Sequence, residues 1–311
     1  MKTFVVTGAS GYIGSHMCYE LKQSYPDCYI IGVDKKQKHK LNHLYDDFLL
    51  YDISRTNFGV FDKYKNVDCV FHFAAYASVP EGEANRWHYY RNNLTGSLRL
   101  IDEAICYGVK NFIFSSTCAV YGYADKKICE LRSKNPSSVY AKTKSIIEDV
   151  LVAADEEKHL NSGILRYFNA AGRNVVADLY EEHDPETHLI PNLMKKDSID
   201  VYGTDFDTRD GTAVRDYIHV IDICRAHIRA YEYMVQNNKG IVTNIGTGRG
   251  YSVLEVIEVV EKIIGRKLNI NFHDRRAGDV DYLVSDVRNM KKLLNFTPEH
   301  DIVSIVKSMR N

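Results

Sequence analysis

The chain has 311 residues, of which 45% are hydrophobic, and its 40 basic residues are almost balanced by 41 acidic ones. This length is sufficient to bury a sizeable core in one large α/β unit or in two domains. The net charge of −1 excludes a global positive field for nucleic acid or an anionic membrane, so any phosphate recognition has to be local.

The N-terminal residues lead directly into a glycine turn, which predicts a first strand and not a secretory signal. The longest apolar run, residues 69–79, is interrupted by His72 and is much shorter than the ~20 residues that span a bilayer. The seven cysteines form no C-x-x-C pair, as is typical of reduced thiols. We therefore expect a cytoplasmic protein that binds neither membrane nor nucleic acid.

No metal site is expected. His39 and His43 have i,i+4 spacing but lie in a lysine-rich stretch that is typical of a solvated loop. The acidic run at residues 205–210 lacks the glycine and the final glutamate of a calcium loop.

In chain order, short apolar runs alternate with helical patterns through the first half, which indicates βαβ units and a parallel sheet. The predicted strands are Phe4–Thr7, Tyr29–Val33, Cys69–Phe73, Asn111–Ser115 and Ser162–Tyr167. The predicted helices are Gly14–Gln23, Tyr89–Tyr107, Val139–Lys158 and, after a change to longer loops, the amphipathic stretch Ser252–Ile264. The fold class is therefore α/β, a doubly wound parallel sheet with a smaller C-terminal α/β domain.

A glycine turn joins the first predicted strand to the first helix, with Gly8, Gly11 and Gly14 in G-x-x-G-x-x-G spacing. Glycines here allow a pyrophosphate to approach the backbone N–H groups at a helix N-terminus. Asp34 follows the second strand, where a carboxylate accepts hydrogen bonds from both ribose hydroxyls and repels a 2′-phosphate. The pattern predicts NAD in preference to NADP, although the positive charge of Lys35, the next residue, would soften the repulsion of a 2′-phosphate. The alternative for Asp34 is a solvated acid at the end of the strand.

Two Tyr-x-x-x-Lys pairs occur. Tyr123 and Lys127 lie in a charged stretch with no apolar period, which predicts a loop. Tyr140 and Lys144 lie in a predicted helix, where residues four apart share a face. A nearby ammonium can stabilise the phenolate of a tyrosine, whose free pKa of roughly 10 is otherwise too high for a base at neutral pH. With the hydroxyl of Thr117 at the end of the fourth strand, the pair indicates proton transfer at a secondary alcohol, the alternative being a solvated helix face.

Together these motifs resemble the extended short-chain dehydrogenase/reductase family and, within it, the UDP-glucose 4-epimerases, over essentially the whole chain. The motifs that carry the resemblance are the glycine turn, Phe73-Ala74-Ala75, Ser115-Ser116-Thr117, Tyr140 with Lys144, the run 165–172, His188-Leu189-Ile190-Pro191, Tyr202-Gly203-Thr204-Asp205, Val214-Arg215-Asp216-Tyr217, Asn244-Ile245-Gly246-Thr247-Gly248 and Arg275-Arg276-Ala277-Gly278-Asp279.

The resemblance implies roles for individual residues. Those expected to contact NAD are Gly8, Gly11, Tyr12, Ile13, Gly14, Asp34, Asp52, Ile53, Phe73, Ala74, Ala75, Asn92, Ser115, Tyr140, Lys144 and Tyr167. Those expected to hold the UDP-sugar are Thr117, Asn169, His188, Leu189, Tyr202, Arg215, Arg276 and Asp279. Guanidinium groups suit a diphosphate, but an interdomain ion pair is the alternative for Arg215 and Arg276. The catalytic residues would be Tyr140, Lys144 and Thr117.

The implied domains are an NAD-binding Rossmann domain at residues 1–167 and a discontinuous substrate domain at 168–311, with part of 212–246 returning to the first. The implied function is a UDP-hexose 4-epimerase that interconverts UDP-glucose and UDP-galactose, or their N-acetyl forms, through a 4-keto intermediate with tightly bound NAD. The resemblance also implies a homodimer that pairs through the helices at 89–107 and 139–158. Leu283 falls where family members gate the sugar pocket.

Two alternatives remain. A sibling enzyme could act on another nucleotide sugar, as a UDP-glucuronate or UDP-pentose 4-epimerase, a dehydratase or a decarboxylase. Dehydratases carry acidic residues where this chain has Cys118 and Ala119. The second alternative is a non-catalytic NAD-binding protein, against which the joint presence of Thr117, Tyr140 and Lys144 argues.

Overall fold

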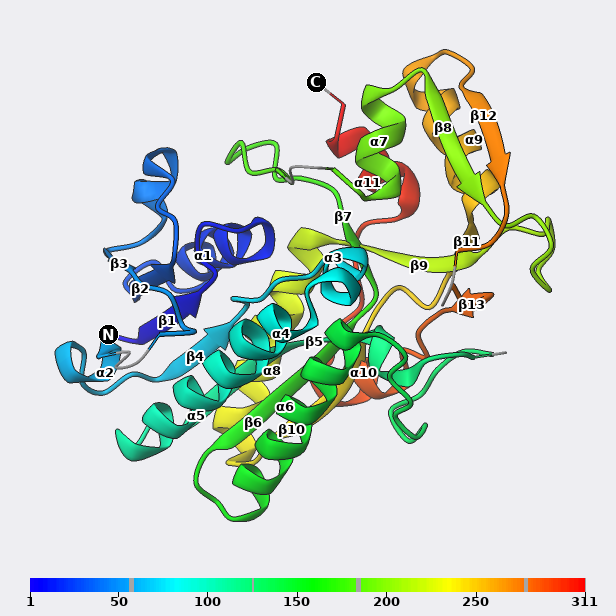
Figure 1. The fold of residues 1–311 in the computed structure, drawn as a ribbon. Coiled ribbons are helices and arrows are strands. Elements are labelled where there is room, and N and C mark those ends of the chain that lie inside the picture. Colours follow the sequence, from blue (N-terminus) through cyan, green and yellow to red (C-terminus); the bar gives the residue numbers. More distant parts are fainter. Residues whose placement is uncertain (56–58, 125, 183–185, 277–278, 311) are drawn as a thin grey trace. The chain divides into compact units, whose positions relative to one another are not determined.

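The structure, a computed structural model, describes residues 1–55, 59–124, 126–182, 186–276 and 279–310. The chain forms two compact units (Figure 1). Unit 1 comprises Met1–Val120, Pro136–Arg166 and Cys224–Thr243, and unit 2 comprises Tyr121–Asn135, Tyr167–Ile223 and Asn244–Asn311. Residues 121–135, assigned to the first domain from the sequence, thus cluster with unit 2, and the return to the first domain is made by 224–243.

Within the described residues, unit 1 is built around a seven-stranded sheet. Its strand order is β10-β6-β5-β4-β1-β2-β3, and the pairs from β5 to β3 are parallel. The strands are β1 (Thr3–Thr7), β2 (Tyr29–Asp34), β3 (Asp47–Leu50), β4 (Cys69–His72), β5 (Asn111–Thr117), β6 (Asn161–Tyr167) and β10 (Ile241–Ile245). The central strands are buried almost throughout, which confirms the doubly wound α/β fold expected from their continuous apolar runs.

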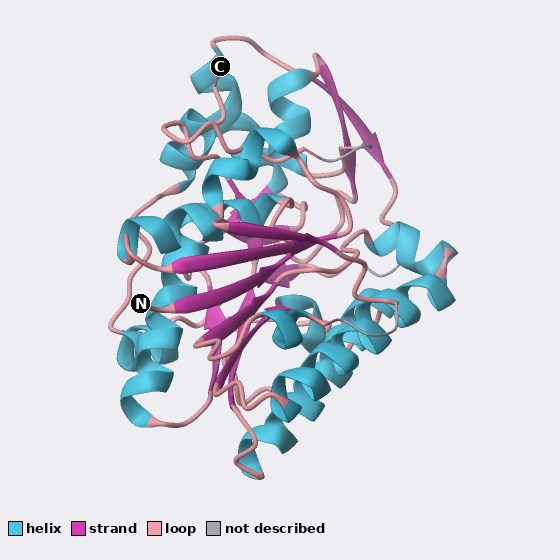
Figure 2. Cartoon of the chain, turned by 90° about the vertical axis from the view of Figure 1, so that its left-hand side faces the viewer, coloured by secondary structure: helices cyan, strands magenta, loops and turns pink. Residues whose placement is uncertain are grey.

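Helices cover both sides of this sheet (Figure 2). The long ones are α1 (Tyr12–Ser24), α5 (Gly96–Cys106), α6 (Val139–Glu156) and α8 (Val220–Asn237), and the short elements are η1 (His39–Leu44), α2 (Val60–Lys63), α3 (Val79–Ala84), α4 (Arg86–Tyr89), η2 (Tyr90–Thr95) and η3 (Cys118–Tyr121). Ser138 caps α6, because its hydroxyl accepts from the N–H of Ala141 at 3.2 Å. Leu100 of α5 and Ile147 and Leu151 of α6 pack with Phe112 and Phe114 of β5 in one apolar core.

The helix expected at 89–107 is not a single regular helix. α4 passes into the π-helical turn η2, and only then does α5 begin. The turn buries Asn92 and Asn93, two polar residues that interrupt the apolar period. A π-helical turn contains one residue more than an α-helical turn, and such turns often occur at functional sites.

Unit 2 is built on a smaller sheet. β9 (Val214–His219) pairs with β7 (Asn169–Ala171), β11 (Gly250–Ser252) and β13 (Tyr282–Leu283), while β8 (Ser198–Tyr202) pairs with β12 (Asn269–His273). The helices are α7 (Leu189–Lys195), α9 (Val253–Ile264), α10 (Arg288–Leu294) and α11 (Ile302–Ser308). The predicted amphipathic helix at 252–264 is α9, which begins at a capping box formed by Ser252 and Glu255. Its residues Val256, Ile257 and Val260 lie in the core of unit 2.

Across the described ranges, every helix is too short or too polar to cross a lipid bilayer.

Candidate active site

The residues expected to contact a dinucleotide gather at one edge of the unit 1 sheet. Gly8 follows β1, Asp34 ends β2, Asp52 follows β3, Phe73 follows β4, and Ser115 lies near the end of β5. These five strands are adjacent and parallel, so their carboxyl ends meet at the same edge. Ligands of doubly wound sheets bind beyond this edge.

The glycine turn forms a cradle that side chains would fill. Gly8 has a φ of +71°, and a Cβ there would lie 2.9 Å from the main-chain nitrogen of Ala74. A Cβ on Gly14 would collide with the carbonyl oxygen of Gly8, and one on Gly11 would lie 3.1 Å from the same oxygen. Gly11 also precedes α1 as an N-cap without a side-chain hydrogen bond. The turn therefore fits the pyrophosphate of NAD, which needs close approach to backbone N–H groups at a helix N-terminus.

Asp34 is held in place by the backbone. Its Oδ2 accepts from the N–H of Ser10 at 3.1 Å and its Oδ1 from the N–H of Lys36 at 3.2 Å. Burial raises the pKa of Asp34, and these N–H groups counteract part of that rise. Asp34 thus presents a fixed acceptor beside the glycine turn, as recognition of a ribose requires.

The π turn is tied to the segment that follows β4. Asn93 accepts at Oδ1 from the N–H of Tyr76 and donates from Nδ2 to the carbonyl of Tyr76, both at 2.9 Å. Asn92 donates from Nδ2 to the same Oδ1 of Asn93 at 2.9 Å. The predicted contact residue Asn92 is therefore positioned by Asn93, which the sequence analysis did not single out. The adjacent Asn-Asn pair in a helical stretch is the sequence signal that marks it.

Tyr140, Lys144 and Thr117 are brought together. Tyr140 and Lys144 lie one turn apart on α6, and the Nζ of Lys144 is 5.9 Å from the centre of the Tyr140 ring. Thr117, at the end of β5, hydrogen-bonds the hydroxyl of Tyr140. Lys144 is buried and donates from Nζ to the carbonyl of Ser115 at 2.7 Å, whereas Tyr140 is partly exposed. The other pair, Tyr123 and Lys127, lies outside helix and strand.

Burial acts on both members of the pair. It lowers the pKa of Lys144 to about 7, and the charge of Glu148 counteracts part of that fall. It raises the pKa of Tyr140 to about 12, while the hydrogen bond with Thr117 lowers it. A phenolate at neutral pH therefore needs positive charge near the ring, which protonated Lys144 provides and to which bound NAD in its oxidised form would add.

Three buried residues beneath this pair were given no role from the sequence, although Ser116 and Arg166 belong to motifs that carry the resemblance. Glu148, the next α6 residue on the face of Tyr140 and Lys144, pairs with Arg166 of β6 and accepts a hydrogen bond from Ser116 of β5. A carboxylate at i+4 from the lysine, within an otherwise apolar stripe, is the signal that could have found Glu148. Its partners, Ser116 on β5 and Arg166 on β6, have no comparable signal in the sequence that would link them to Glu148.

In unit 2, three of the expected substrate residues form one group. Arg276 donates from Nε to Asp279 Oδ2 at 3.0 Å, and its guanidinium lies 4.9 Å from the centre of the Tyr202 ring. Arg276 thus has a carboxylate partner within its own unit. Ala277 and Gly278 of the same motif lie outside the described residues.

Asn169, Arg215 and Leu283 share the small sheet of unit 2. Asn169 of β7 is in register with Tyr217 of β9, and Leu283 of β13 is in register with Arg215 of β9. Arg215 donates from Nη1 to the carbonyl of Val214 at 3.0 Å. Residues far apart in sequence are thus placed on neighbouring strands.

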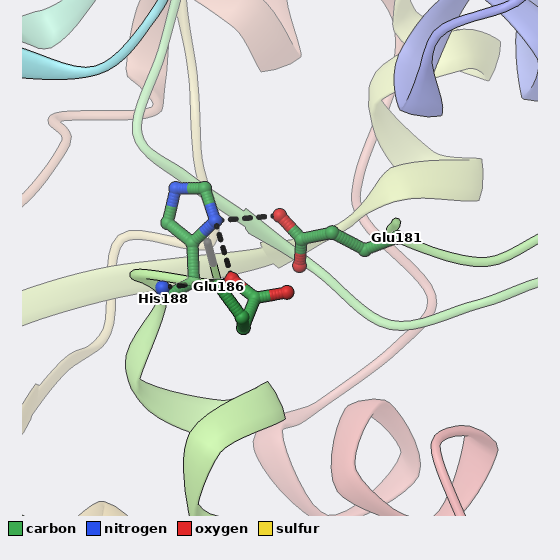
Figure 3. Close-up of side chains that lie close together, drawn as sticks. All are labelled: Glu181, Glu186 and His188. Carbon is green, nitrogen blue, oxygen red and sulfur yellow. Dashed lines mark hydrogen bonds and ion pairs between the residues drawn. The ribbon is translucent and has the colours of Figure 1, made fainter. Parts of the chain in front are cut away.

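His188 lies in an ion-pair cluster just before α7, which begins at Leu189 (Figure 3). Its Nδ1 is 2.6 Å from Glu181 Oε1 and 3.5 Å from Glu186 Oε1. Burial alone would lower the pKa of His188, but the hydrogen bond and charge of Glu181 raise it overall. The three side chains are close enough to share a metal ion, yet a protonated imidazole between two carboxylates accounts for the arrangement.

Comparison with known proteins gives the family of the chain. Residues 4–246 match the NAD dependent epimerase/dehydratase family. The UDP-glucose 4-epimerase of Lactobacillus helveticus is 38% identical over 321 residues, which cover 98% of this chain and 94% of the relative. The solved structure of UDP-glucose 4-epimerase from Brucella ovis in complex with NAD has a TM-score of 0.92 at 35% identity, covering 99% of this chain and 97% of that one. That from Bifidobacterium longum in complex with NAD+ and UDP has a TM-score of 0.88 at 31% identity, covering 99% and 96%. The chain belongs to the NAD dependent epimerase/dehydratase family.

Proposed function

We propose that the chain is a UDP-hexose 4-epimerase that interconverts UDP-glucose and UDP-galactose with bound NAD. The observation that carries the proposal is the grouping of Tyr140, Lys144 and Thr117 at the sheet edge that bears the glycine cradle. The similar proteins named above are UDP-glucose 4-epimerases, and two of them were solved with NAD.

In this mechanism Tyr140 acts as the base for the sugar. Its phenolate removes the proton of the 4-hydroxyl, and Thr117 holds the tyrosine oxygen through the hydrogen bond between them. Lys144 stabilises the phenolate as an ammonium one helical turn away. NAD would be held by the glycine turn and Asp34 and would supply reversible hydride acceptance at C4. After the 4-keto sugar had turned its other face, the returning hydride would regenerate the alcohol, and Tyr140 would give the proton back to the 4-oxygen.

Unit 2 is proposed to hold the UDP. Tyr202, Arg276 and Asp279 offer a ring, a guanidinium and a carboxylate in one group, and Arg215 offers a second cation for the diphosphate. Leu283, beside Arg215 in the sheet register, is proposed to limit the size of the sugar. The leucine side chain is intermediate in volume between a tyrosine and the smallest residues. UDP-N-acetylhexoses are therefore a second class of substrate for the assay below.

We also infer that the protein acts as a homodimer in the reducing cytoplasm. The helical segments at 86–106 and 139–156 expose Trp87, Ile146 and Val152, apolar side chains that a partner would cover. All seven cysteines are free thiols. Light scattering on the purified protein measures the oligomer directly, and a monomeric mass would overturn the dimer.

The test is turnover of UDP-galactose by the wild-type protein and by Tyr140→Phe. The variant is expected to lose about 10³-fold in kcat, because a positioned base contributes that order of magnitude, while UDP affinity stays within about twofold. A panel of UDP-N-acetylhexoses, UDP-glucuronate and UDP-pentoses identifies the preferred sugar. Full activity in Tyr140→Phe would defeat the assignment, and no turnover of any UDP-sugar by the wild type would favour a non-catalytic role.

A further inference from the structure

Strand β5 and helix α6 contact each other through matched polar residues. Three consecutive strand residues each meet one residue of the same helix face: Ser115 with Lys144, Ser116 with Glu148 and Thr117 with Tyr140. Two of these contacts belong to the catalytic group described above. The third, between Ser116 and Glu148, lies one turn deeper along α6.

The carboxylate of Glu148 is fixed on both oxygens. Oε1 accepts from Arg166 Nε at 2.9 Å and from the hydroxyl of Ser116, and Oε2 accepts from Arg166 Nη2 at 2.6 Å. The side chains of Glu148 and Arg166 are 1% and 8% exposed. A bidentate pair of this kind keeps its orientation. Buried ion pairs are costly to desolvate and are often replaced by apolar residues without loss of stability, so stability alone does not account for this one.

In the described part of the chain, Glu148 is the residue whose negative charge raises the pKa of Lys144, and it lies one helical turn further along α6. The ammonium meets the carbonyl of Ser115 at 2.7 Å and the ring of Phe114 at 4.6 Å, neither of which carries a charge. Among the described residues, the titratable groups placed against it are Tyr140 on its own helix and His72 on β4, and burial and the charge of Lys144 keep His72 neutral. Arg166 of β6 faces Glu148, with which it forms an ion pair at 2.6 Å.

We propose that Glu148 is a positioning residue of the active site, whose carboxylate, oriented by Ser116 and Arg166, keeps Lys144 charged beside Tyr140 and so sets the upper pH limit of catalysis. The inference rests on the proposed function. Loss of the carboxylate removes its negative charge from the surroundings of the buried Lys144 and breaks the ion pair of Glu148 with Arg166. Lys144 then releases its proton at a lower pH, and the phenolate of Tyr140 loses its partner.

The experiment compares the pH profile of kcat in wild type, Glu148→Gln, Glu148→Asp and Asp149→Asn. Glu148→Gln removes the charge and keeps the shape, and is expected to lower kcat at pH 7 about tenfold, to move the alkaline limb about one pH unit lower and to leave KM within about twofold. Glu148→Asp keeps the charge and should therefore show the alkaline limb of wild type, even if it lowers Tm. Asp149→Asn removes the neighbouring exposed carboxylate of the same helix and should match wild type.

A second readout does not depend on turnover. Selective ¹³Cε labelling of lysine allows the Lys144 resonance, identified by its absence in Lys144→Met, to be titrated in each folded variant by NMR. A lower midpoint in Glu148→Gln than in wild type supports the inference. An unchanged Lys144 midpoint and alkaline limb in Glu148→Gln would overturn it, and so would a folded Glu148→Asp variant whose midpoint has moved below that of wild type. Absence of wild-type turnover with a shifted Lys144 midpoint would instead count against the proposed function alone.

Discussion

The ammonium of Lys144 lies 5.9 Å from the centre of the Tyr140 ring, one turn further along the same helix. Burial lowers the pKa of Lys144 to about 7 and raises that of Tyr140 to about 12, so both groups are pushed towards their neutral forms. The fold compensates each in part, Lys144 through Ser115 and Glu148 and Tyr140 through Thr117. Because the folded chain has to bury the charged form of Lys144, this lysine carries a cost in stability at neutral and lower pH.

Replacing Lys144 by methionine should stabilise the protein most at low pH. The folded pKa of about 7 lies below the ordinary value of 10.5, so between these values the unfolded chain binds more protons than the folded one. The free-energy cost of burying the charged Lys144 in the wild type is therefore fully present below pH 7 and decreases as the pH rises towards 10.5. We expect a gain on the order of a few kcal/mol at pH 6 and a clearly smaller one at pH 9, measured as free energies of unfolding in denaturant. Equal gains at both values would contradict the prediction, and kcat should be nearly abolished.

Gly14→Ala should remove most of the bound dinucleotide. The new Cβ would collide with the carbonyl oxygen of Gly8, so the cradle has to open. We expect at least about a tenfold fall in NAD released per chain on denaturation, measured by chromatography. The control is Gly59→Ala, where a Cβ meets open space and only the positive φ of +62° opposes it, at a cost of about 1–2 kcal/mol. Full occupancy of Gly14→Ala by NAD would contradict the proposed role of the glycine turn in binding the pyrophosphate.

Asp34→Ala should weaken discrimination between the two dinucleotides. The carboxylate is held by Ser10 and Lys36, ready to accept from ribose hydroxyls and to repel a 2′-phosphate. Loss of a charged hydrogen bond, worth about 1.5–3 kcal/mol, is expected to raise the Kd for NAD about tenfold or more and to improve NADP relative to NAD. Calorimetry with both dinucleotides on cofactor-free protein measures the ratio. An unchanged ratio would point to a different ribose contact.

The fold is largely readable from the sequence because the central strands are buried on both faces. Continuous apolar runs therefore mark β1, β4 and β5. Strand β3, Asp47–Leu50, is missed because it lies at the sheet edge and is only partly buried. The π turn at Tyr90–Thr95 is missed because helical periodicity does not reveal one inserted residue.

The candidate site is readable only where its geometry is local. Tyr140 and Lys144 are joined by helical spacing, and the glycine turn by chain order. The pairing of Glu148 with Arg166 depends on which strand lies beside β5, and that is decided by tertiary packing. Long-range pairings of this kind have no signature in a single sequence.

In the proposed reaction, C4 of the sugar exchanges hydride with a dinucleotide that stays bound. The most direct test is conversion of UDP-[4-²H]galactose in ordinary water by the purified protein without added NAD, followed by mass spectrometry and NMR. The expected product is UDP-glucose that retains deuterium at C4. Washout of deuterium into solvent during conversion, or conversion only when free NAD is supplied, would contradict it.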